Sequence, residues 1–178
     1  MKLNKTFLTV IIGLAIPMTS FAAPTVTFQG EVTSQTCKAA INGDTNSMVL
    51  LPTVPASELS SAGMKTGLTP FTISVSDCQV DTTDVDITTN FLGHNVTTTG
   101  NLGNLATANP AENVSIQLTT NAAGNTPVVL NGITPVKGLV LATGQTSASH
   151  QFGAQYYAED AATAGAVTAV AEYTLSYN

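Results

Sequence analysis

Short stretches of alternating apolar and polar residues, separated by clusters of turn-forming residues, recur along most of this chain. The candidate strands lie at 48–54, 71–78, 85–91, 114–120, 127–130, 150–158 and 166–178. Between them lie stretches such as NGDTNS and TTTGNLGN, whose Gly, Asn and Thr residues favour turns and loops. No window sustains the 3.6-residue period of an amphipathic helix. The spacing predicts an all-β fold in one domain, a two-sheet sandwich of immunoglobulin-like architecture.

The last candidate strand alternates as far as the final residue. Tyr173, Leu175 and Tyr177 share one face with Ala169 and Ala171. Because the chain stops with this strand, we expect no later segment of the chain to cover its apolar edge. An uncovered edge strand invites pairing with another chain.

The first 22 residues have the pattern of a secretory signal peptide. Lys2 and Lys5 precede the apolar run FLTVIIGLAIPM, and Ser20 and Ala22 are the small residues expected just before a cleavage site. The apolar run is too short, and wrongly flanked, for a membrane span. Of the 178 residues, 156 then remain, a size that suits a single domain.

Two cysteines, Cys37 and Cys78, belong to the exported part of the chain. In an oxidising compartment a disulfide is the default state of such a pair. A metal site is the alternative, but it needs further ligands, and the histidines His94 and His150 are single and far apart in sequence. A bridge over this span stabilises a fold by about 4 kcal/mol in the chain-entropy model.

The charge of the chain argues against polyanionic partners. All five basic residues are lysines, and two of them lie in the signal peptide, so three remain against eleven acidic residues, a net charge of −8. No basic patch is available to bind phosphate groups. We therefore expect no binding to nucleic acid.

Motifs for catalysis and metal binding are weak. The stretch from Asp77 to Asp86 is rich in aspartate, but it lacks the residue order and the glycine of an EF-hand loop. A hydrolytic triad using His94 or His150 would lack the G-x-S-x-G signature of a nucleophile elbow. GNLGNL at 100–105 has no strand–loop–helix context for a phosphate cradle. We expect no catalytic residue, no metal and no cofactor.

Residues 23–36, directly after the signal peptide, contain one further alternating stretch. Val26, Phe28, Gly30 and Val32 share a face, and the apolar row therefore has a gap at Gly30. From the pattern alone, this segment is either the first strand of a closed sandwich or a strand that completes the sheet of a neighbouring subunit.

Several marks together resemble the subunits of chaperone-usher fimbriae, in particular the type 1 pilin class. They are VTFQGEV before Cys37, the spacing from Cys37 to Cys78, FGAQYYAEDAATAGAV, the penultimate Tyr177, and Gly165 at the fourteenth position from the end. The resemblance covers the chain after the signal peptide. It implies an immunoglobulin-like sandwich that lacks its seventh strand and is completed by the donor strand of a neighbouring subunit.

The resemblance also implies roles for residues and partners. Residues 1–22 would be the signal peptide, 23–36 the donor-strand extension and 37–178 the pilin domain. The implied donor residues are Val26, Phe28, Gly30 and Val32, and the implied acceptor and chaperone edge is Gly165, Tyr173, Leu175 and Tyr177. The implied partners are a periplasmic chaperone, an outer-membrane usher and other fimbrial subunits, chiefly copies of this chain.

Three functions follow from these observations. The first is a structural subunit, exported through the periplasm, that polymerises by donor-strand exchange into a surface fimbria for adhesion. The second is a minor adaptor, terminator or receptor-binding subunit of the same kind of fimbria. The third is a secreted β-sandwich enzyme, which would need a pocket with titratable residues, and the sequence supplies few of these.

Overall fold

The computed structural model describes residues 35, 37–45 and 47–178. The predicted signal peptide and the four predicted donor residues, Val26, Phe28, Gly30 and Val32, lie outside the described residues. Within the described part, no helix is long and apolar enough to cross a membrane.

The secondary structure of the described residues consists of eight strands and one short 3-10 helix, which confirms the all-β prediction. They are β1 (Lys38–Ile41), η1 (Ala56–Leu59), β2 (Lys65–Ser76), β3 (Val85–Gly93), β4 (Leu102–Gly103), β5 (Val114–Thr119), β6 (Ile133–Leu141), β7 (Ala148–Ala158) and β8 (Ala171–Tyr177).

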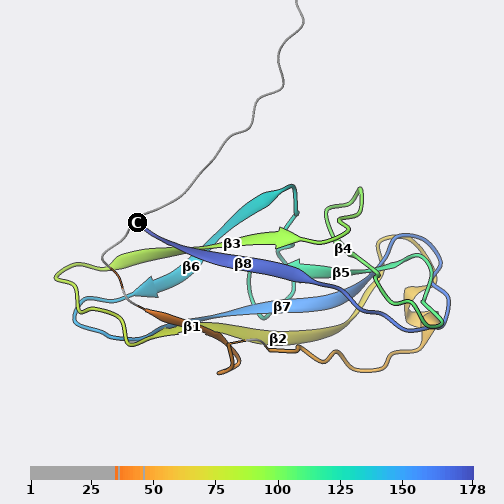
Figure 1. Ribbon diagram of the computed structural model, residues 1–178. Helices are drawn as coiled ribbons and strands as arrows, with labels where there is room; N and C mark the ends of the chain where they lie inside the picture. The colour runs from red at the N-terminus through yellow and green to blue at the C-terminus, as the bar shows by residue number, and fades with distance from the viewer. Residues whose placement is uncertain (1–34, 36, 46) are drawn as a thin grey trace, which may run out of the picture. The chain divides into compact units, whose positions relative to one another are not determined.

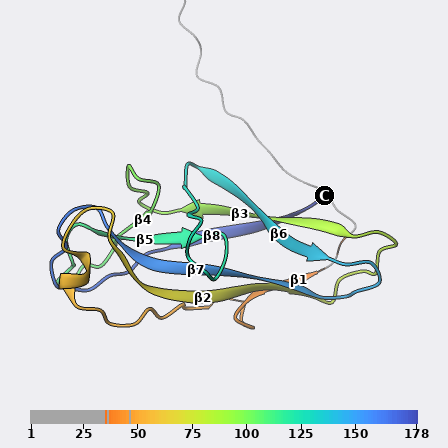
Figure 2. The ribbon, with the colours of Figure 1, turned by 180° about the vertical axis from the view of Figure 1, so that it is seen from behind.

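The strands form two sheets, which pack as the two layers of a sandwich. One sheet has the order β1-β2-β7-β5-β4 and the other the order β6-β3-β8. All pairings between the named strands are antiparallel. Figures 1 and 2 show β3, β6 and β8 in one layer, and β1, β2 and β7 in the other. The strands β1 and β8 are therefore both sheet edges.

The core lies between the two layers and is filled by alternate residues of both. Ile73 of β2 and Phe152 of β7 are buried on one side, and Ile87 of β3 on the other. The Phe152 ring stacks on Phe71 at a centroid distance of 5.6 Å and meets the edge of the Phe91 ring at 5.3 Å. This packing explains the period of two in the sequence, because only the inward residues need to be apolar.

Most of the predicted strands are present. The segments predicted at 71–78, 85–91, 114–120 and 150–158 correspond to β2, β3, β5 and β7, and β2 begins earlier than predicted, at Lys65. The last strand is shorter than predicted, since β8 begins at Ala171. Its predicted phase is confirmed: Tyr173, Leu175 and Tyr177 pack against the core.

Two strand predictions were wrong, and three strands were missed. Residues 48–54 and 127–130 form no strand, and β1, β4 and β6 were not predicted. The short β1 and β4 carry too few residues to show an alternation. In β6, the sequence ITPVKGLVL hides its period because the register of β6 against β3 shifts between Ile87 and Thr89. A bulge of this kind breaks the alternation of inward and outward side chains.

A polar cluster on the outer side of β5 and β7 fixes the connection between β3 and β4. The Glu159 carboxylate accepts hydrogen bonds from the hydroxyls of Ser115 at 2.7 Å, Thr99 at 2.7 Å and Thr97 at 3.0 Å. The Asn101 amide also donates to it, at 3.3 Å. The Glu159 carboxylate, directly after β7, thus ties the β3–β4 connection to β5.

Candidate functional site

The free edge of β8 is the first element of the site. Strand β8 pairs with β3 from Ile87↔Tyr177 to Gly93↔Ala171, and it is the last strand of its sheet. Within the described residues no strand lies on its other side. The backbone groups of an edge strand that point away from its neighbour are free to pair with an added strand.

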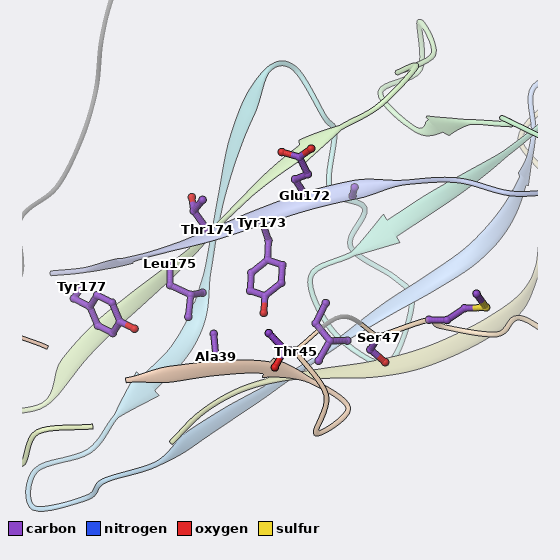
Figure 3. A pocket seen from close by; sticks show the side chains of 11 residues that line it. Ala39, Thr45, Ser47, Glu172, Tyr173, Thr174, Leu175 and Tyr177 are labelled. Carbon is purple, nitrogen blue, oxygen red and sulfur yellow. The ribbon is translucent and has the colours of Figure 1, made fainter. Parts of the chain in front are cut away.

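A groove runs along this edge and separates it from β1. It has a volume of about 860 Å³. Its near wall is Ala171, Glu172, Tyr173, Thr174, Leu175 and Tyr177, and its far wall is Ala39, Ile41, Thr45, Ser47 and Met48. In Figure 3 the side chains of Tyr173, Leu175 and Tyr177 point across the groove toward the far wall, whereas Glu172 and Thr174 point away from it.

The groove opens onto the hydrophobic core. Partly buried apolar residues on both walls of the groove pack against the core: Ile41 on the far wall, and Ala171, Tyr173, Leu175 and Tyr177 on the near wall. Full burial is reached by residues such as Phe152 and Ile87, which lie deeper between the sheets. The described residues therefore leave one seam of the core partly uncovered.

Residues 48–54, of which Met48 lines the groove, belong to neither sheet. Val49 and Leu51 pack against the core, while Met48 and Leu50 are 79% and 77% exposed. The side chains thus alternate as the sequence predicted, but no described strand pairs with the segment to form a ladder. The prediction of a strand failed because a strand is defined by its partner as well as by its own pattern.

Gly165 does not join the other predicted edge residues. It lines a second cavity, of about 430 Å³, together with Leu59, Ala111 and Tyr156. A Cβ at position 165 would lie 2.4 Å from Ala111 N and 2.6 Å from Asn109 O. A glycine is therefore required at position 165, because another segment of backbone passes too close to allow a side chain. Gly165 also lies outside the groove that holds Tyr173, Leu175 and Tyr177.

The predicted disulfide joins Cys37 and Cys78. It links the residue before β1 to the region that follows β2, and the metal alternative for these cysteines is excluded because both sulfurs are bonded to each other. The bridge thereby holds the start of β1, and with it the far wall of the groove, close to the end of β2.

The electrostatics of the groove are simple. Burial raises the pKa of the Tyr173 phenol, so this hydroxyl stays neutral at physiological pH.

His94, which we considered for catalysis, lies with Nε2 3.0 Å from Glu172 Oε1 on the outer face of β8, and His150 Nε2 lies 2.8 Å from Thr120 O. Among the described residues, no three His, Cys, Asp or Glu side chains gather as a metal site requires.

Sequence reasoning found the near wall of this groove but missed the far wall. Ala39, Ile41, Thr45, Ser47 and Met48 were not singled out. Cys37 was the available signal. Its bridge to Cys78 places the residues after Cys37 beside β2, and thus at a sheet edge.

The two-sheet sandwich with its edge strand β8 defines the fold class of this chain as an immunoglobulin-like sandwich. It superposes on the crystal structure of the P pilus rod subunit PapA with a TM-score of 0.58 at 17% identity, covering 79% of this chain and 99% of PapA. At this identity the likeness concerns the fold.

Sequence comparison gives the family. The model of the family described as fimbrial protein matches residues 26–178, and the chain therefore belongs to this family. It is 38% identical to the F17 fimbrial protein of Escherichia coli over 157 residues, 85% of this chain and 86% of that protein. It is 36% identical to the major fimbrial subunit SMF-1 of Stenotrophomonas maltophilia over 178 residues, 92% of this chain and 98% of that protein. The chain is a structural subunit that assembles with other subunits into a surface fimbria.

Proposed function

We propose that the groove along β8 accepts the N-terminal extension, residues 23–36, of the next subunit, and that the fimbria grows by this donor-strand exchange. Among the described residues, an edge strand with no neighbouring strand on its outer side coincides with a groove whose apolar lining packs against the core, and this observation carries the proposal. Strand addition uses both features, because backbone hydrogen bonds supply affinity and pockets for alternate side chains supply specificity.

The extension matches the groove in pattern and in length. Strand β8 has seven residues, about 23 Å at the usual rise per residue, and Val26 to Val32 also span seven residues. Phe28 and the two valines would face the core, and Gly30 would lie where the acceptor leaves no room for a side chain. Burying a valine or phenylalanine side chain contributes about 1.5 to 3 kcal/mol each. With the added ladder, such a joint dissociates slowly.

The open seam also implies a partner before assembly. A core that is partly exposed along one edge makes a free subunit prone to aggregation. We propose that residues 1–22 direct export and that a periplasmic chaperone covers the groove. An outer-membrane usher would then exchange the chaperone for the extension of another subunit, usually a further copy of this chain.

A peptide complementation experiment tests the exchange. The mature chain without residues 23–36 is refolded with a peptide of the sequence Ala23 to Thr36, and with the same peptide carrying Gly30→Asn. We expect the unmodified peptide to yield a stable monomer and the Gly30→Asn peptide to fail. A shortened chain that is already a stable monomer without peptide would contradict the proposal.

Electron microscopy distinguishes a major from a minor subunit. With cleavage after Ala22, the proposed extension before Cys37 has only fourteen residues, and an adaptor, terminator or receptor-binding role is therefore the alternative. Deletion of a major subunit removes the whole fibre. Deletion of a minor subunit leaves the fibre and removes adhesion or changes fibre length.

A further inference from the structure

The chain contains two Asn-Gly sequences, and the side chains of their asparagines differ in hydrogen bonding. Asn42-Gly43 follows β1, and Asn131-Gly132 precedes β6. In an Asn-Gly sequence the glycine backbone nitrogen can attack the side-chain carbonyl carbon of the asparagine, because glycine has no Cβ to shield its nitrogen. The position of the asparagine side chain then decides whether the attack is possible.

The side chain of Asn42 is held away from this reaction. Its Oδ1 accepts a hydrogen bond from Thr72 N at 2.8 Å, and its backbone N donates to Thr72 O, also at 2.8 Å. Thr72 belongs to β2, the neighbouring strand. To reach Gly43 N, the Asn42 side chain must first give up its bond to the sheet.

Asn131 has no such restraint. Its backbone N donates to Thr134 Oγ1 at 3.0 Å, but within the described residues its side-chain amide has no hydrogen-bond partner. The backbone N of Gly132 also has none among the described residues, and a Cβ at Gly132 would meet nothing within 4 Å. Asn131 and Gly132 are themselves exposed, although Leu130 directly before them is buried. Figures 1 and 2 show the start of β6, in teal, projecting from the sandwich.

We infer that Asn131 is a site of spontaneous deamidation in the folded subunit and that Asn42 is protected. Gly132 N, losing its proton, forms a bond to Asn131 Cγ, and the bond from Cγ to the side-chain nitrogen breaks to release ammonia. The resulting five-membered succinimide is opened by water at either carbonyl. Opening at one gives aspartate, and opening at the other gives isoaspartate, which adds a methylene to the main chain.

The change has a consequence for a long-lived polymer. Each event places a new carboxylate at an exposed position, two residues in sequence from the exposed Val129 and Ile133. The isoaspartate product also lengthens the turn that leads into β6. Subunits in a fibre would therefore accumulate aspartate and isoaspartate at this turn over time, independently of donor-strand exchange.

Peptide mapping by mass spectrometry tests the inference on intact fimbriae. Fimbriae of the full mature chain are incubated at neutral and at mildly alkaline pH, and the conversion of amide to acid is followed at both asparagines. Because release of Asn42 requires loss of at least one hydrogen bond, we expect conversion at Asn131 to be about tenfold faster or more. We expect both rates to rise with pH, because the attacking nitrogen must lose its proton.

The reduced, denatured chain is the matched control, since both Asn-Gly sequences are then free and should convert at similar rates. In a second control, Gly132→Asp should slow conversion at Asn131, because aspartate tolerates the positive φ of 66° at this position while its Cβ shields the nitrogen. Equal rates at the two sites in folded fimbriae, faster conversion at Asn42, or no conversion at Asn131 would each overturn the inference.

Discussion

The Thr89 hydroxyl is unusual among buried polar groups in its hydrogen bonding. Thr89 is fully buried on β3, opposite Leu175 of β8, and its hydroxyl has no hydrogen-bond partner among the described residues. We expect Thr89→Val to raise the free energy of unfolding by about 1 kcal/mol, because a buried unpaired hydroxyl is replaced by a methyl group of similar size. Chemical denaturation of the peptide-completed subunit measures this.

Thr119→Val is the matched comparison. Thr119 is equally buried, but its hydroxyl donates to Asn121 O at 2.8 Å. The same substitution should therefore lower stability at position 119. If both substitutions destabilise to the same extent, the Thr89 hydroxyl has a partner and the prediction is wrong.

Gly165 gives a second prediction at the scale of a residue. Gly165→Ala places a methyl group 2.4 Å from Ala111 N, a contact that requires the backbone to move. We expect a loss of about 1 to 3 kcal/mol in the free energy of unfolding. Ala164→Ser, at the exposed neighbouring position, should leave stability nearly unchanged. Equal stability of the two variants would show that the crossing is not tight.

At the scale of an element, the two faces of β8 should contribute differently to donor binding. Leu175 points into the groove and Thr174 points away from it. Leu175→Ala removes apolar contact with an inserted strand and should weaken binding of the peptide Ala23 to Thr36 by about tenfold or more. Thr174→Ala should change it little. Dissociation rates of labelled peptide distinguish the faces, and equal effects would contradict insertion into the groove.

The Glu159 cluster predicts a pH dependence for the elements that it connects. Burial raises the pKa of the Glu159 carboxyl, but the hydrogen bonds from Ser115, Thr99, Asn101 and Thr97 outweigh burial, and the net pKa lies below the usual 4.5. A lowered carboxyl pKa contributes stability that is present above the unfolded-state pKa and is lost as the pH falls through the folded-state value.

Glu159→Gln tests this contribution. The difference in unfolding free energy between the original chain and Glu159→Gln should be constant between about pH 6 and 8 and should shrink as the pH falls below the usual value of 4.5. Denaturation curves across this range give the measurement. A difference that stays the same down to pH 3 would show that the carboxylate charge makes no contribution to the cluster.

At the scale of the whole molecule, the disulfide and the open seam act together. The bridge closes a loop with a sequence separation of 41 residues, and its removal by Cys37→Ser and Cys78→Ser should cost about 4 kcal/mol. Among the described residues one seam of the core is only partly covered, and a fold with such a seam has a small margin of stability. We therefore expect the peptide-completed double variant to fold but to be digested faster than the peptide-completed original chain, and the double variant without peptide to be the least protected of all. Protease resistance with and without peptide separates these outcomes.

The sequence by itself determined the all-β class, the Cys37–Cys78 bridge and the inward face of β8. These features depend on the period of two and on a single pair of thiols, which are local properties of the chain. The tertiary structure alone decided that 48–54 stays outside both sheets, that Gly165 lies at a backbone crossing, and that Ala39, Ile41 and Met48 face β8 across the groove. The physical reason is that strand pairing joins residues far apart in sequence. The alternation within a segment does not show which strand, of the same chain or of another, will complete its hydrogen bonds.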